Sequence, residues 1–115
     1  PQSMQSAWAE RGAILVPCQG KGSNIDLQKA FSKLAELGLT RILCEGGPTL
    51  AAGLISAKLV DQIVTFNAGL TLGNESQAVL GQLHLTALSQ ATGWQQLATQ
   101  TIGNDVMTTW GSPQP

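Results

Sequence analysis

The sequence RILCEGGPTL, residues 41–50, decides the expected fold. It opens with a short apolar run, which is typical of a β-strand buried in a parallel sheet. The run passes directly into two glycines and then into Pro48, a residue suited to the first position of a helix. The segment therefore predicts a strand that turns into a helix, and Lys58 is expected in the last turn of that helix.

The flanking sequence continues the alternation of strand and helix. Residues 13–16, AILV, are a second candidate for a buried strand, and residues 27–37 carry apolar side chains at helical spacing. Asp26 is the expected N-cap of that helix, and Gly38 the expected stop. Residues 60–67 are a third strand candidate. This order predicts βαβ units with a right-handed crossover in a parallel sheet.

The C-terminal part of the chain has a different pattern. Residues 94–100 and 106–110 flank the turn sequence IGND and predict a β-hairpin. Residues 75–90 are expected to form a loop with short helical turns, and residues 1–10 show no clear period. The fold class expected is therefore α/β, with a three-layer mixed sheet. Its parallel strands are flanked by helices, and it ends in an antiparallel hairpin.

Composition excludes several functional classes. The chain has 115 residues, of which 43% are hydrophobic and only 11% charged, and its formal net charge is −1. Because no cluster of Lys and Arg is present to neutralise phosphates, we expect no nucleic-acid binding. No apolar run approaches the length of a membrane span, so no membrane partner is expected. So few charges predict that part of the apolar surface faces another chain, as in a homo-oligomer, or a missing part of the same chain.

The cysteines are informative about metal binding and about the cell compartment in which the protein is found. Cys18 and Cys44 have no CxxC spacing, and His84 is the one histidine of the chain, so no metal site is expected. Two scattered cysteines fit a reducing compartment, which predicts a cytoplasmic protein. A disulfide between them stays open at this point.

The junction at residues 45–49 carries the chemistry of the sequence. In open α/β sheets, ligands bind at the carboxyl ends of the strands. Two glycines let a ligand approach the backbone, and the first turn of a helix offers free N–H groups and a positive dipole end to a phosphate. Glu45 would then contact a polar substrate or handle a proton. The alternative interpretation is a tight turn with Glu45 as a solvated or capping carboxylate.

A resemblance to a known family favours the first interpretation. Residues 42–50, ILCEGGPTL, and residues 59–63, LVDQI, resemble the C-terminal reductase domain of bifunctional RibD, which has a dihydrofolate-reductase-like fold. Residues 25–27 and the closing sequence IGNDV at residues 102–106 are also similar to that family. The resemblance extends from about Ala13 to Trp110.

The resemblance implies an oxidoreductase of riboflavin biosynthesis. Such an enzyme uses NADPH to reduce 5-amino-6-(5-phosphoribosylamino)uracil to its ribitylamino form, and the family includes dimers. Mapped onto this sequence, Glu45 matches the glutamate that contacts the substrate. The positions that match the cofactor loop and helix start are Gly47, Pro48, Thr49, Leu50, Ala51, Ala52 and Gly53.

The family's reductase domain is longer than this chain, so residues 1–115 are expected to form a single, truncated domain of this type. The functional alternatives stay open at this point. One is a related dihydrofolate-reductase-like reductase that acts on another pyrimidine or on a pteridine. The other is a non-catalytic module that forms dimers.

Overall fold

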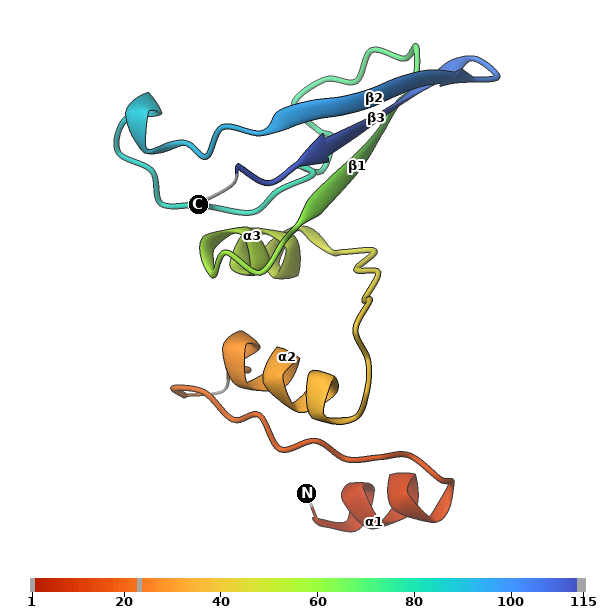
Figure 1. Cartoon of the computed structure of the whole chain (residues 1–115), viewed down its shortest axis with the longest axis vertical. Coiled ribbons are helices and arrows are strands. Elements are labelled where there is room, and N and C mark those ends of the chain that lie inside the picture. The colour runs from red at the N-terminus through yellow and green to blue at the C-terminus, as the bar shows by residue number, and fades with distance from the viewer. Residues whose placement is uncertain (1, 23, 114–115) are drawn as a thin grey trace. The chain divides into compact units, whose positions relative to one another are not determined.

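The computed structural model describes residues 2–22 and 24–113 and divides the chain into two compact units, residues 1–43 and 44–115. The first unit contains helices α1 (Gln2–Glu10) and α2 (Leu27–Glu36). The second contains helix α3 (Pro48–Ser56), strand β1 (Gln62–Asn67), the short 3₁₀ helix η1 (Leu88–Gln90), and strands β2 (Gln95–Ile102) and β3 (Asp105–Gly111). Figure 1 shows these elements in the order of the chain.

The three strands form one antiparallel sheet in the order β1-β3-β2, with β3 in the centre (Figure 1). The ladder between β1 and β3 pairs Gln62 with Gly111 and Asn67 with Val106 at its two ends. The ladder between β2 and β3 is the expected hairpin, with a register shift between Gln96 and Ala98. The predictions of the hairpin and of a strand within residues 60–67 are therefore confirmed. That strand was expected in a parallel sheet, whereas β1 pairs antiparallel with β3.

The parallel part of the expected sheet is not present among the described residues. Residues 13–16 and 41–44 lie in no strand, and the one pairing in the first unit is an isolated bridge between Gln19 and Ile25. The physical reason is that an apolar run specifies burial but supplies no partner for its backbone. A parallel strand also needs a neighbouring strand along its edge. Leu43 is instead 83% exposed.

Helix α2 begins and ends as expected. The Asp26 side chain accepts a hydrogen bond from the backbone N–H of Lys29 at 3.0 Å, which makes it the N-cap. Gly38 follows the helix with a φ of +85°. Its N–H donates to the Ala35 carbonyl, while the Leu39 N–H donates to Leu34, which is the Schellman pattern of a helix end.

The other two helices end in the same motif. In α1, which the sequence patterns did not predict, Gly12 has a φ of +83° and Ala13 donates to the Trp8 carbonyl. In α3, the equivalent bonds run from Lys58 to Ile55 and from Leu59 to Leu54. Lys58 has a φ of +56°, so it takes a left-handed conformation that usually belongs to glycine. The prediction that Lys58 lies in the last turn of the helix is wrong, since it lies two residues beyond Ser56.

The core of the chain is small. Ala52 and Leu54 of α3, each 4% exposed, are the buried hydrophobic residues in the described part of the chain. Helix α3 lies beside the sheet (Figure 1), and Ile55 lines the same hollow as Ile63 of β1 and Trp110 of β3.

Replacing Lys58 with glycine is expected to stabilise the protein. A side chain in the left-handed region costs about 1 kcal/mol, and glycine removes that cost. We expect the free energy of unfolding of Lys58→Gly to rise by about that amount, measured by urea denaturation with far-UV circular dichroism. Lys58→Ala is the matched control, because it removes the charge but keeps the Cβ atom. Equal stabilisation by both variants would show that the charge, and not the backbone, is responsible.

Candidate functional site

The loop that leads into α3 consists of Glu45, Gly46 and Gly47. Gly46 has a φ of +98°, which explains why glycine is required there. Gly47 is the N-cap residue, with φ −79° and ψ −167°, and the peptide bond between the two glycines is cis. A Cβ atom added at either glycine would meet no atom within 4 Å. The backbone is therefore open to an approaching ligand on the side where these Cβ atoms would lie.

The first turn of α3 has free hydrogen-bond donors. Pro48 has no N–H, and the Ala51 N–H donates to the Gly47 carbonyl at 3.0 Å. No side chain caps this end of the helix, and in the described part of the chain no acceptor faces the N–H groups of Thr49 and Leu50. These two donors and the helix dipole together form the arrangement that binds a phosphate in many proteins.

A distant loop closes one side of this first turn. The Gly81 N–H donates to the Pro48 carbonyl at 3.0 Å. A Cβ atom at Gly81 would lie 3.1 Å from that carbonyl oxygen and 3.3 Å from the Cα atom of Thr49. Only glycine therefore fits here without a shift of the backbone. The sequence analysis missed Gly81, and a single glycine inside a loop gave no signal for it.

Glu45 is exposed, and its carboxylate has no hydrogen bond or ion pair to the described residues. It lies one residue before Gly46, at the entrance to the same loop. A carboxylate in this position is available to a polar ligand rather than engaged in the fold. The structure therefore does not support Glu45 as a capping carboxylate, whereas a solvated carboxylate, the other form of the alternative, fits its exposure.

The predicted cofactor residues differ in accessibility. Gly47, Thr49 and Leu50 are exposed, whereas Pro48, Ala51 and Gly53 are half-buried. Ala52 is only 4% exposed, so its side chain belongs to the core. The part of the predicted set that a ligand can reach is the loop and the first turn.

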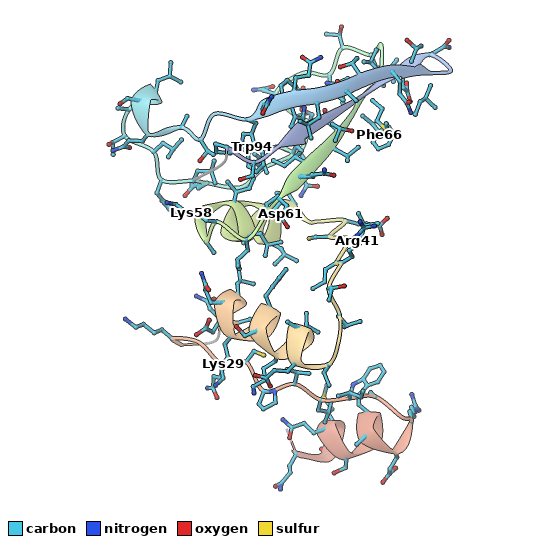
Figure 2. The ribbon with its side chains drawn as sticks, viewed as in Figure 1. Lys29, Arg41, Lys58, Asp61, Phe66 and Trp94 are labelled. Carbon is cyan, nitrogen blue, oxygen red and sulfur yellow. The ribbon has the colours of Figure 1, made fainter. Side chains whose placement is uncertain are left out.

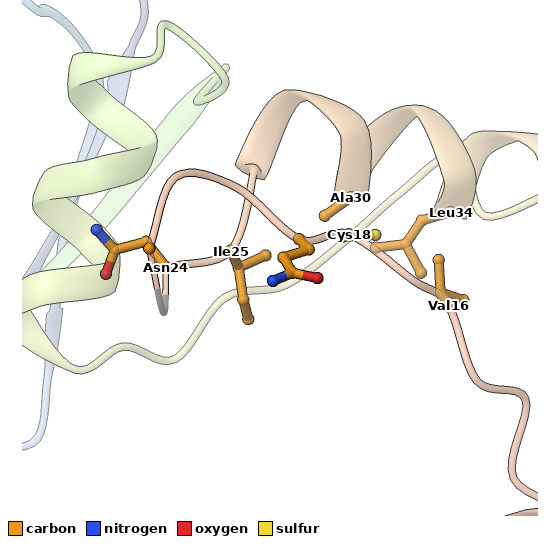
Figure 3. Close-up of a pocket in the computed structure, with 8 residues that line it drawn as sticks. Val16, Cys18, Asn24, Ile25, Ala30 and Leu34 are labelled. Atoms are coloured by element: carbon orange, nitrogen blue, oxygen red, sulfur yellow. The ribbon is translucent and has the colours of Figure 1, made fainter. Parts of the chain in front are cut away.

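Two hollows are lined by residues other than those of this loop. One, of about 440 Å³, belongs to the first unit and is lined by Val16, Cys18, Asn24, Ile25, Ala30 and Leu34, among others (Figure 3). The other, of about 410 Å³, lies in the second unit beside Trp94 and Trp110. Neither includes any residue from 45 to 53. The donors of the candidate site are backbone N–H groups of the exposed residues Thr49 and Leu50.

Both cysteines, Cys18 and Cys44, are free thiols. In residues 2–22 and 24–113, no group of three or more His, Cys, Asp or Glu side chains is placed to hold a metal ion. Within the same residues, no helix is long and apolar enough to cross a membrane.

Comparison with known proteins identifies relatives of the whole chain. The family model described as the RibD C-terminal domain matches residues 2–108. The riboflavin biosynthesis protein RibD of Chlamydia pneumoniae is 30% identical over 80% of this chain. The protein of the same name from Escherichia coli is 29% identical over 86% of it. These matches cover 24% and 27% of the relatives, so the chain spans about a quarter of their length.

Solved structures show the same fold. Two solved structures of Acinetobacter baumannii RibD, form 2 and form 1, match with TM-scores of 0.77 and sequence identities of 19% and 20%. The matches cover 94% and 95% of this chain and 29% of the RibD chain. The helices and the small antiparallel sheet described above therefore correspond to one part of the RibD structure.

A side chain at Gly81 is expected to destabilise the second unit. Gly81→Ala forces its Cβ atom toward the backbone of Pro48 and Thr49, and overpacking of this kind costs about 1–3 kcal/mol. We expect the urea midpoint of the protein to fall accordingly. Gly93→Ala is the matched control, because a Cβ atom there meets nothing within 4 Å. If both variants are equally stable, the contact between Gly81 and α3 does not hold the loop in place.

Proposed function

The chain belongs to the RibD C-terminal domain family, and on this premise we propose that it contributes a cofactor-binding surface to a reductase of riboflavin biosynthesis. The cofactor proposed is NADPH. The observation that carries the proposal is the first turn of α3, where free N–H groups of Thr49 and Leu50 adjoin two open glycines. Membership of the family alone would support common ancestry with RibD, but it would not support cofactor binding by this chain.

The proposed contact is between a phosphate group of NADPH and the backbone of residues 47–50. An anion at a helix N-terminus is stabilised by about 0.3–2 kcal/mol through the dipole, and charge-assisted hydrogen bonds from N–H groups add to this. Gly46 and Gly47 leave room for the phosphate to approach the backbone. The residues present therefore fit the group, because they offer donors and space and no competing carboxylate cap.

Glu45 is proposed to contact the substrate. When bound, NADPH supplies a hydride. In the proposed reaction the ribosyl group of 5-amino-6-(5-phosphoribosylamino)uracil is reduced to a ribityl chain. The exposed carboxylate of Glu45 would accept hydrogen bonds from the hydroxyl groups or ring N–H groups of such a substrate. Its position before Gly46 supports this role, since substrate and cofactor must meet within a few ångströms for hydride transfer.

The same proposal includes the finer features of the fold and the location. Residues 13–16 and 41–44 are proposed to pair as parallel strands of a three-layer, dihydrofolate-reductase-like sheet, as part of the same proposal. Their apolar character and the high exposure of Leu43 support this. A cytoplasmic location is supported by the two free thiols, which fit a reducing compartment.

Titration of the purified chain with NADPH by calorimetry tests the proposal. We expect a dissociation constant in the micromolar to low millimolar range, roughly −4 to −8 kcal/mol of binding free energy. Gly47→Val should weaken binding at least tenfold, because its side chain fills the space that the phosphate needs. Gly47 suits this test better than Gly46, since its φ of −79° is open to other residues.

Two controls make the result specific. Glu45→Gln should keep the wild-type affinity for NADPH, because the proposed partner of Glu45 is the substrate. Gly93→Val adds the same side chain at another open glycine and should also leave binding unchanged. The proposal for this chain fails if the folded wild-type protein does not bind NADPH, or if Gly47→Val binds as well as wild type.

A further inference from the structure

The hollow of about 410 Å³ in the second unit has no part in the function proposed above. Pockets that bind small molecules have volumes of about 300–1,000 Å³ and are lined mainly by apolar and aromatic side chains, with a few polar groups. This hollow has that composition. Its lining consists of aliphatic side chains, the two tryptophans Trp94 and Trp110, and the two threonines Thr65 and Thr92.

The lining also determines the charge and shape of a suitable ligand. Among the described residues that line the hollow, none carries a charge. An ionised ligand would therefore lose its hydration without gaining a partner, which is unfavourable. Indole rings favour flat aromatic partners, which they contact by offset stacking or edge to face. An uncharged, planar aromatic molecule meets both conditions.

The polar groups of the hollow differ in whether they have partners. The Trp110 indole N–H donates to Thr65 Oγ1 at 3.4 Å, and Thr65 Oγ1 donates to the Thr108 carbonyl at 3.5 Å. Trp94, which directly precedes strand β2 (Figure 2), is half-buried, and its indole N–H has no acceptor among the described residues. An indole N–H can only donate, so this group favours a ligand that carries a hydrogen-bond acceptor.

The wall of the hollow that residues 80–92 form is held by hydrogen bonds near its two ends. At one end, the Gly81 N–H donates to the Pro48 carbonyl of α3 at 3.0 Å. At the other, Gln90 Oε1 accepts bonds from the N–H groups of Thr86 and Ala87, at 2.8 Å and 3.4 Å. The Thr86 hydroxyl donates to the same oxygen at 3.1 Å. A wall that is already ordered lowers the entropy cost of binding a ligand.

We propose that this hollow binds a small, uncharged, planar heteroaromatic molecule. Its ring would contact the indole rings of Trp94 and Trp110, and the aliphatic side chains would shield it from water. An acceptor at the edge of the ring would receive the hydrogen bond of the Trp94 N–H. The site is independent of the proposed cofactor surface, because none of residues 45–53 lines the hollow.

Titration of the ¹⁵N-labelled chain with quinoline, followed by NMR, tests the proposal. Quinoline is planar and uncharged at neutral pH, and its ring nitrogen is a hydrogen-bond acceptor. The three tryptophans of the chain each give one indole N–H signal. We expect the signals of Trp94 and Trp110 to shift saturably, with a dissociation constant of about 0.1–1 mM. The signal of Trp8, which lies in α1, should not move.

Two variants locate the binding site. Trp94→Leu should weaken quinoline binding at least tenfold, read from the Trp110 signal, because it removes an aromatic ring and the free donor. Ala91→Phe should weaken binding by a similar factor, because its ring would fill the hollow from an exposed position. Trp8→Leu is the matched control. It makes the same substitution outside the hollow, so its affinity should equal that of wild type.

The backbone amide spectrum shows whether each variant is folded, and Ala91→Phe decides the question if Trp94→Leu does not fold. The proposal is overturned if quinoline causes no saturable shift of the Trp94 and Trp110 signals at concentrations up to about 10 mM. It is also overturned if the Trp8 signal shifts with the same concentration dependence, which would indicate adsorption to any accessible tryptophan. Wild-type affinity in a folded Trp94→Leu or Ala91→Phe variant would equally reject it.

Discussion

The central strand β3 is the element on which the second unit depends. It pairs with β2 through a tight hairpin and with β1, which lies more than thirty-five residues earlier in the chain. Side-chain bonds reinforce the long-range pairing: the Trp110 indole N–H donates to Thr65 Oγ1 at 3.4 Å, and Thr65 Oγ1 donates to the Thr108 carbonyl at 3.5 Å. This pairing fixes β1, whose Ile63 lines one hollow together with Ile55 of α3.

The candidate site lies at the N-terminal end of helix α3. Helix α3 contributes Ala52 and Leu54 to the small core, so its side chains stabilise the fold while its N-terminal backbone stays open. The contact of Gly81 with Pro48 closes one side of the first turn and leaves the side of Gly46 and Gly47 accessible. The middle of this helix thus belongs to the core, whereas its first turn presents the free N–H groups of the candidate site.

The described residues bury few apolar side chains. A chain with two buried hydrophobic residues in its described part has little hydrophobic stabilisation of its own. Large apolar side chains are exposed in both units, among them Trp8, Leu43, Phe66, Leu70 and Leu88. Those at residues 13–16 and 41–44 are the ones that we propose to pair as strands of a larger sheet.

The sequence by itself determined the local elements and the family. Helical spacing, Asp26 and Gly38 specified α2, Pro48 placed the start of α3, and the turn sequence at residues 102–105 specified the hairpin, because each of these signals acts over a few residues. The glycines at 46 and 47 marked the candidate loop for the same reason. The sequence patterns did not predict α1, because its residues have no apolar stripe and bury nothing, although Gly12 ends it by the usual motif. Only the tertiary structure decided that β1 pairs antiparallel with β3, that residues 13–16 and 41–44 have no strand partner, and that Gly81 packs on α3. These features depend on which distant segments are present to meet each backbone edge, and a local pattern carries no information about that.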